Sequence, residues 1–361
     1  MSRFALVVTA LLGVTYAYLA ARLATGASSA VALATPFVLI WILPVVYWGS
    51  ERGREGLVDK LLHRAAYLSM AWVSFALVLT VLRDLLLIAT FAAPELHQRV
   101  AGLGWAWVAG ASLVAMAIGA AAAFNGPRVE EVDVRVEGLH PDLEGFRIAQ
   151  ISDLHVGPNI GRRYVQRVAD LTQALKPDIV VLTGDIVDGS VQKLADDVAP
   201  LAALSNAYFI LGNHDCYAGA EPWMAHWRQA GMSVLANAST VIRKGAARLL
   251  IGGMVDPAYA RVRPSIEIRD EADFRLLLAH NPKLAPIGAK AGFDLQLSGH
   301  THGGQFFPWT LAVRLVHAPH VAGLSREGRM LVYVSAGTGT WGPPVRFGTS
   351  PELTLLRLVR A

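Results

Sequence analysis

The chain has 361 residues, of which 53% are hydrophobic and only 17% are charged, and its mean hydropathy is +0.40. This composition excludes a disordered, fibrous or wholly water-soluble protein, and the net charge of +4 is too small to indicate nucleic-acid binding. The single cysteine, Cys216, excludes an intrachain disulfide.

The charged residues are unevenly distributed along the chain. Residues 1–125 contain eight Lys or Arg and five Asp or Glu, whereas the remainder contains 24 basic and 23 acidic residues. We therefore expect an apolar N-terminal domain over residues 1–125 and an ordinary globular domain over residues 126–361.

Four runs without charged residues in the N-terminal domain are long enough to cross a bilayer, which takes about 20 residues. These runs are Phe4–Ala21, Leu23–Ser50, Ala65–Leu82 and Val100–Asn125. They lack the polar stripes of a water-soluble helix bundle, so an all-α membrane domain of about four transmembrane helices is predicted. In an alternative interpretation the first run is a cleaved signal peptide, which leaves three crossings.

The charges between the runs predict the orientation. The segment 51–64 holds four basic residues, whereas only Arg83 and Arg99 lie between the third and fourth runs. Because basic loops stay in the cytoplasm, we predict a multi-pass protein of the inner (plasma) membrane with its C-terminal domain in the cytoplasm. The adjacent Arg83 and Asp84 are interpreted as charges paired with neighbouring helices, the alternative being a functional polar site in the membrane.

Beyond Pro127 the pattern changes to alternating strands and helices, which predicts an α/β domain. The predicted strands are 132–136, 146–151, 178–183, 208–211, 274–279, 293–298 and 330–334, and the predicted helices are 161–175 and 192–204.

A polar cluster follows nearly every buried strand of this domain. In chain order the clusters contain Asp153 and His155; Asp185 and Asp188; Asn213, His214 and Asp215; His280; and His300 and His302. Because ligand sites of open α/β sheets lie beyond the carboxyl ends of the strands, we expect these side chains to converge. Carboxylates, imidazoles and a carboxamide suit Mn, Fe or Zn, with Ni or Co possible, and they are too numerous for one tetrahedral ion.

The motifs occur in the order Asp-x-His, Gly-Asp-x-x-Asp, Gly-Asn-His-Asp, a lone His, and Gly-His-x-His. This order resembles the calcineurin-like metallophosphoesterases over residues 146–360. The sequences at 299–305 and 337–344 are most similar to the membrane-attached bacterial branch of that superfamily. The resemblance implies two packed β-sheets flanked by helices, an αββα sandwich.

The resemblance also implies roles for individual residues. A first divalent metal ion would be held by Asp153, His155, Asp185 and His302, and a second by Asp185, Asn213, His280 and His300. Asp185 would then bridge the two ions, which activate a water molecule for attack on phosphorus. His214 would be the catalytic group that faces the phosphate, and Asp188 and Asp215 would orient the ligands.

The substrate class stays open at this stage. The resemblance implies hydrolysis of a phosphomonoester, a phosphodiester or a pyrophosphate and does not choose among them. We predict a phosphodiester or pyrophosphate, and the predicted membrane domain favours a lipid-linked substrate. One narrower alternative is a UDP-2,3-diacylglucosamine pyrophosphatase of lipid A synthesis. Two further alternatives are a non-catalytic membrane scaffold or sensor and a channel or transporter with an appended domain.

The segment 303–329, which follows the last motif, is rich in apolar residues. It contains Phe306, Phe307, Trp309, Leu311 and Leu315, with Arg314 among them. The favoured interpretation is that these residues pack on the second sheet as core. The alternative is a membrane-facing flap beside the site, in which the aromatic rings and the arginine lie at the headgroup boundary.

Overall fold

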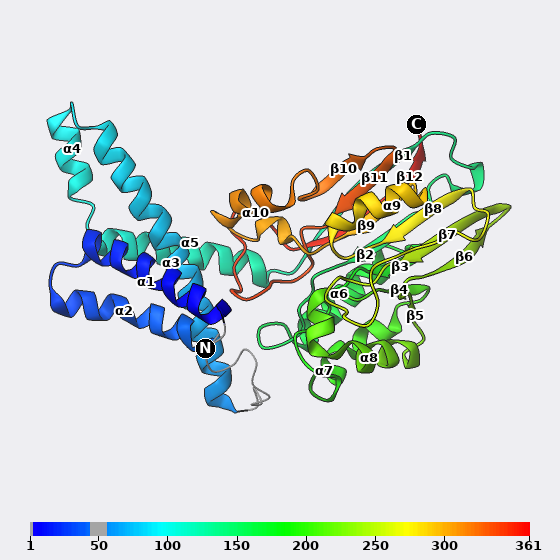
Figure 1. Ribbon diagram of the computed structural model, residues 1–361, viewed down its shortest axis with the longest axis horizontal. Helices are drawn as coiled ribbons and strands as arrows, with labels where there is room; N and C mark the ends of the chain where they lie inside the picture. The colour runs from blue at the N-terminus through cyan, green and yellow to red at the C-terminus, as the bar shows by residue number, and fades with distance from the viewer. Residues whose placement is uncertain (1–2, 44–55) are drawn as a thin grey trace. The chain divides into compact units, whose positions relative to one another are not determined.

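The computed structural model describes residues 3–43 and 56–361, which form two compact units (Figure 1). The first unit comprises the chain up to Ala121 together with the short segment Gly342–Phe347. The second unit comprises Ala122–Trp341 and Gly348–Ala361.

The first unit is helical. Its elements are α1 (Arg3–Leu23), α2 (Ala27–Ile42), α3 (Leu57–Ala89), α4 (Pro94–Ala101) and α5 (Trp105–Phe124). Among the described residues, α1, α3 and α5 are long and apolar enough to cross a membrane. Helix α2 has 16 described residues, and the end of the run predicted there, residues 44–50, lies outside the described part of the chain.

Two predicted boundaries in this unit are wrong. The segment 51–64 is not a loop throughout, because α3 begins at Leu57; the charged residues of its first turns are tolerated where a long helix extends beyond the hydrocarbon. The fourth run is not continuous either, since α4 ends at Ala101 and α5 begins at Trp105. The glycines at 102 and 104, which favour a break over helix, lie between them.

The charged pair at the end of the third run is partnered, as predicted. Asp84 Oδ2 lies 2.9 Å from Arg22 Nε and accepts a hydrogen bond of 2.9 Å from the Tyr18 hydroxyl. Arg83 donates to the carbonyl oxygen of Ala101 at 3.2 Å. These partners let α3 continue past the pair to Ala89 and connect it to α1.

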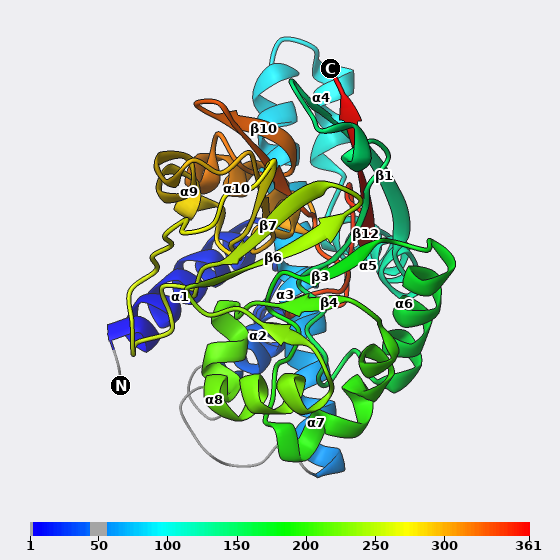
Figure 2. The same ribbon diagram turned by 90° about the vertical axis from the view of Figure 1, so that its right-hand side faces the viewer.

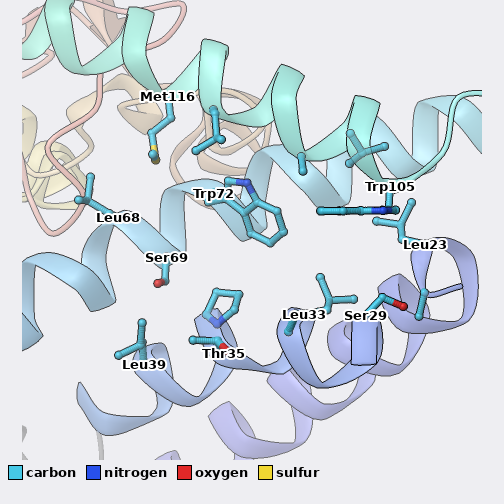
Figure 3. A pocket seen from close by; sticks show the side chains of 16 residues that line it. Leu23, Ser29, Leu33, Thr35, Leu39, Leu68, Ser69, Trp72, Trp105 and Met116 are labelled. Atoms are coloured by element: carbon cyan, nitrogen blue, oxygen red, sulfur yellow. The ribbon is translucent and has the colours of Figure 1, made fainter. Parts of the chain in front are cut away.

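An apolar pocket of about 430 Å³ lies within the helical unit (Figure 3). It is lined by side chains from α1, α2, α3 and α5, among them Leu23, Leu33, Trp72 and Trp105. The 16 described residues that line it carry no ionisable side chain, so the pocket contains no group for acid–base or metal chemistry.

The described residues of the second unit form two six-stranded sheets. The first has the order β1-β12-β2-β3-β4-β5, formed by Arg128–Val136, Glu352–Arg360, Arg147–Ile151, Ile179–Leu182, Ala207–Phe209 and Ser233–Val234. The second has the order β10-β11-β9-β8-β7-β6, formed by Gly323–Glu327, Met330–Val334, Leu295–Ser298, Phe274–Leu278, Ala247–Gly253 and Ala238–Lys244. Strands β2 to β5 are parallel, and so are β7, β8, β9 and β11.

The two sheets pack face to face with helices on both outer sides (Figure 2). Ile148 and Val181 of the first sheet share a buried core with Leu276 and Leu297 of the second. The helices are α6 (Arg162–Ala174), α7 (Val191–Val198) and α8 (Asn213–Gln229) on the first sheet, and α9 (Ala285–Ala291) and α10 (Trp309–His317) beyond the second. Short 3₁₀ turns occur at Pro141–Leu143, Ala199–Ala203, Pro282–Leu284 and His302–Gly304.

This architecture confirms the predicted αββα sandwich preceded by a helical region. The buried parallel strands read as short apolar runs in the sequence because both of their faces are covered. Burial on both faces also places every polar residue of the site at a strand end, where the chain leaves the sheet.

Candidate metal centre

The predicted ligands all follow strand ends, and they come from both sheets. Asp153 and His155 follow β2, Asp185 follows β3, and Asn213 is the first residue of α8 after β4. His280 follows β8, and His300 and His302 follow β9. The shared edge of the sheet sandwich therefore brings together residues that are up to 149 positions apart, as from Asp153 to His302.

The donor atoms of these residues form three overlapping groups, in each of which the atoms lie within 4.8 Å of one another. The groups are Asp153, His155 and His302; His155, Asp185 and His214; and Asp185, His280 and His300. Asp185 is shared by two groups: its Oδ2 lies 3.2 Å from His280 Nε2 and 3.8 Å from His155 Nε2. This position, between two imidazoles from different sheets, is the one that a bridging carboxylate needs.

The backbone at the site is unusual. Nine non-glycine residues in the described part of the chain have positive φ, and five of them are predicted ligands: Asp153, His155, Asp185, His300 and His302. Left-handed backbone is costly for such residues and concentrates at functional sites, where the surrounding structure enforces it. These turns direct the side chains back across the strand ends and into the cluster.

Two glycines allow the close approach of these turns. A Cβ at position 212 would lie 2.2 Å from Asp185 Oδ1, and a Cβ at 299 would lie 2.1 Å from Asp153 Oδ2. Any side chain at either position would therefore displace a predicted ligand. The glycine requirement at both motifs is steric.

The donor set fits divalent metal ions. His280 donates from Nδ1 to the Thr183 carbonyl oxygen at 2.8 Å, and its buried Nε2 has no hydrogen-bond partner among the described residues. The Nε2 atoms of His155 and His302 face each other at 3.0 Å. Bonding at one imidazole nitrogen fixes the tautomer and leaves the other to coordinate, which is the usual arrangement of metal-binding histidines.

Asn213 and His214 occupy different positions although they are adjacent. Asn213 Oδ1 lies 2.9 Å from His300 Nδ1, which joins it to the group formed by Asp185, His280 and His300. His214 lies on the other side, with Nδ1 bonded to Asp188 Oδ1 at 2.8 Å and with its side chain partly exposed. Its ring also contacts those of Tyr217 and Trp341, at centroid distances of 5.7 and 5.9 Å.

Two further aspartates support the cluster. Asp188 Oδ1 accepts from His155 Nδ1 at 2.9 Å as well as from His214, so one carboxylate orients both rings. Asp215 is buried and accepts from the backbone N–H groups of residues 185, 186, 187 and 212. Asp215 therefore acts through the backbone turn that carries Asp185, and not through the side chain of a proposed ligand.

The electrostatics match this arrangement. Burial disfavours the imidazolium of His155, but the Asp188 carboxylate outweighs burial and raises the pKa of His155 to about 9. Burial likewise opposes charge on His280, and Asp185 outweighs it and raises the pKa of His280 to about 10. Burial and then the charge of His280 lower the pKa of His300 to about 3. Protons therefore compete with metal ions for His155 and His280 but not for His300.

The sequence interpretation assigned no role to three residues near the site, although one of them, Trp341, lies in the motif at 337–344. Asp256 follows β7 and is buried, and its Oδ2 has no hydrogen-bond partner among the described residues. His317 of α10 lies with its ring centroid 5.3 Å from that of His300. The backbone N–H of Trp341 donates to Gln305 Oε1 at 2.8 Å, which holds the ring beside His214. A strand prediction at 247–253 would have exposed Asp256 as another strand-end carboxylate; the other two contacts are purely tertiary.

Comparison with known proteins supports the family resemblance found in the sequence. A family model for calcineurin-like phosphoesterases matches residues 146–304. The chain is 34% identical to a transmembrane protein with a metallophosphoesterase domain from Danio rerio, over 65% of this chain and 58% of that protein. It is 31% identical to an uncharacterized metallophosphoesterase of Helicobacter pylori J99, over 64% of each chain.

Phosphodiesterase YaeI of Escherichia coli is 33% identical, and the match covers 59% of this chain and 82% of that protein. The chain belongs to the calcineurin-like phosphoesterases. It spans less than two thirds of the length of the fish and Helicobacter relatives. The family match covers all the predicted ligands, from Asp153 to His302.

Proposed function

We propose that this calcineurin-like phosphoesterase is a membrane-anchored enzyme that hydrolyses a phosphodiester or pyrophosphate with two divalent metal ions. Residues 126–361 form its hydrolase domain and residues 1–125 its membrane anchor. The observation that carries the proposal is the position of Asp185, whose carboxylate lies between His155 and His280 and belongs to two of the three donor groups.

The proposed ligand sets are built from the three donor groups, except that His214, which shares a group with His155 and Asp185, is assigned to the substrate and not to a metal ion. Asp153, His155, Asp185 and His302 hold one ion, and Asp185, Asn213, His280 and His300 hold the other. Carboxylate, carboxamide and imidazole donors in this ratio suit Mn, Fe or Zn. When bound, such an ion pair lowers the pKa of a water molecule and neutralises the charge that develops on phosphoryl oxygens.

His214 is the side chain that we propose to contact the substrate. Asp188 orients His214 through Nδ1, so Nε2 is the nitrogen left to meet a phosphoryl or leaving-group oxygen. His214 is partly exposed, whereas the predicted ligands His155 and His280 are buried, so a substrate reaches His214 from outside the ion cluster. We assign His214 the role of stabilising the transition state or protonating the leaving oxygen.

Cys216 is not the nucleophile in this proposal. Burial, reinforced by Asp215, raises the pKa of its thiol well above the usual range, so a thiolate is strongly disfavoured at neutral pH.

The membrane helices favour a lipid-linked substrate. Only residues 125–127 separate α5 from β1, so the hydrolase domain stays close to the bilayer. UDP-2,3-diacylglucosamine, a pyrophosphate made at the cytoplasmic face, is the narrower candidate, and the predicted cytoplasmic orientation agrees with it. The inner (plasma) membrane is the proposed location.

A panel of substrates tests the proposal on the full chain in detergent micelles. It contains a phosphomonoester, a soluble phosphodiester and a lipid-linked pyrophosphate, each assayed with and without Mn²⁺. We expect metal-dependent hydrolysis of the diester, the pyrophosphate or both. Hydrolysis of none of them by metal-loaded protein would favour the alternative of a membrane scaffold or sensor without turnover.

A further inference from the structure

Helix α10 presents large apolar side chains to the exterior of the second unit. Trp309 is 51% exposed, Leu311 56%, Val316 58% and Leu315 90%. None of the nine described residues of α10 is buried. The favoured sequence interpretation, that this segment packs as core, is therefore wrong for the helix, although Phe306 just before it is buried.

The polar residues Thr310 and His317 of α10 are half-buried against their own domain, whereas Arg314 is exposed. Thr310 and Arg314 line a hollow of about 400 Å³ together with Arg128 at the start of β1 and Glu352 at the start of β12. His317 contacts His300 of the metal cluster. At about 100° per residue these three polar residues share one side of the helix, and the apolar residues occupy the rest. The largest apolar side chains of the helix are therefore exposed while Thr310 and His317 are half-buried, which is the reverse of the usual pattern of a surface helix at these positions.

The helix is held firmly in this orientation. Phe306 is anchored in the core, and its carbonyl oxygen accepts from the backbone N–H of Trp309 at 2.9 Å. Gly304 packs so closely on the first turn that a Cβ there would lie 2.5 Å from the Cα of Thr310. Rotation of α10 to bury its apolar side would break these contacts, so the exposed face needs an external partner.

The chemistry of the helix selects a bilayer as that partner. Its charged or ionisable residues are Arg314 and His317, and its sequence has no acidic residue, which suits anionic headgroups. A tryptophan at one end and leucines along the face are typical of helices that lie in the interface plane. The three residues between α5 and β1 span at most about 11 Å, so a membrane is within reach of the domain.

We propose that α10 is an interfacial helix that inserts Trp309, Leu311, Leu315 and Val316 into the headgroup–acyl boundary of the membrane that holds the chain. This surface is distinct from the spanning helices and does not require the proposed hydrolysis. Where the proposed function also holds, the contact between His317 and His300 places the membrane-bound helix directly beside the reaction site. A substrate entering along α10 would then come from the lipid surface.

Spin-label accessibility tests the proposal on the full chain, with one copy in each nanodisc of mixed phosphatidylethanolamine and phosphatidylglycerol. Cys216→Ala removes the native thiol, and labels are placed through Leu315→Cys or Val316→Cys. Val262→Cys is the matched control, because Val262 is an apolar residue of the same unit that is 49% exposed. Collision rates are measured with oxygen, which enters lipid, and with a nickel chelate, which stays in water.

We expect labels at 315 and 316 to collide with the nickel chelate several-fold less often than the label at 262, and with oxygen more often. Equal nickel accessibility at the three positions would overturn the proposal, because the face would lie in water. Protection of 315 and 316 from both reagents would also overturn it, because a protein surface would then cover the helix. Since the readout is not hydrolysis, an inactive protein still tests the proposal.

Discussion

Among single residues, the histidines of the site differ in their hydrogen-bond partners and in their exposure. His280 is bonded through Nδ1 to a carbonyl oxygen, so its Nε2 is directed to the carboxylate of Asp185. His214 is bonded through Nδ1 to Asp188 and lies toward the exterior. The proposed ligand His280 and the proposed substrate-facing group His214 differ mainly in exposure, since both are bonded through the same ring nitrogen.

This difference predicts separate effects of two neighbouring substitutions. His214→Ala should leave the metal content almost unchanged and lower kcat by roughly 10²–10⁴, the usual contribution of a positioned acid. Asn213→Ala should instead lower metal content, because it removes a proposed ligand. Elemental analysis together with steady-state kinetics distinguishes the two, and loss of both ions from the His214 variant would show that our assignment of its role is incorrect.

The histidine pKa values predict how metal binding depends on pH. His155 and His280, with pKa values of about 9 and 10, are protonated at pH 7 in the ion-free protein, and each must lose its proton to coordinate. Affinity should therefore rise with pH from 7 toward 9, by up to about tenfold per pH unit for each proton displaced. Chelator competition at several pH values measures this, and a pH-independent affinity would contradict the proposed ligands.

Among the described elements of the hydrolase domain, the sequence predicted seven of twelve strands and the helices α6 and α7. It did not predict β5, β6, β7, β10 and β12 or the helices α8, α9 and α10. Apolar runs marked the buried strands because both of their faces are covered, and the polar residues after them marked the site. The left-handed backbone at Asp153 and His302 could not be predicted, because contacts from other strands enforce it. Neither could the orientation of α10: a helical apolar pattern does not state whether its apolar side faces the core or the exterior.

In the helical unit, too, the sequence did not predict where helices begin or which residues are in contact. The charged residues in 57–64 indicate a loop, although these residues form the first turns of α3. Arg83 and Asp84 were correctly interpreted as partnered, but their partners Tyr18 and Arg22 on α1 could be identified only from the structure.

This charged contact between helices predicts a stability effect. Asp84→Ala should lower the free energy of unfolding by about 1–3 kcal/mol, because Tyr18 and Arg22 lose their shared acceptor. Glu95→Ala, which removes an exposed acidic side chain from α4 of the same unit, is the matched control. Thermal unfolding in detergent compares the variants, and equal midpoints for both would mean that the contact contributes nothing.

At the scale of the whole molecule, the two units serve different needs of one proposed reaction. The helical unit offers an apolar pocket without ionisable groups, whereas the α/β unit gathers all the candidate metal ligands at one edge of its sheets. The proposed anchoring would restrict the hydrolase domain to molecules at or near the membrane, which is why we favour a lipid-linked substrate over a freely diffusing one.

The orientation of the chain is a separate prediction at this scale. A C-terminal fusion to a fluorescent protein that matures only in the cytoplasm should fluoresce, and a fusion to a phosphatase that is active only outside the cytoplasm should be inactive. The basic residues before and within the first turns of α3 are the reason for this expectation. The opposite pattern would also rule out a substrate made at the cytoplasmic face.

In the proposed mechanism, Asp185 links two metal ions on which hydrolysis depends. The most direct measurement is the metal-to-protein ratio of the purified full chain and of Asp185→Asn, with phosphodiester hydrolysis followed on the same samples. We predict two ions per wild-type chain, loss of hydrolysis on chelation with recovery on adding Mn²⁺, and loss of both ions and activity in a folded Asp185→Asn variant. Wild-type hydrolysis that persists after complete chelation, or an Asp185→Asn variant that keeps two ions and full activity, would contradict the bridging role of Asp185.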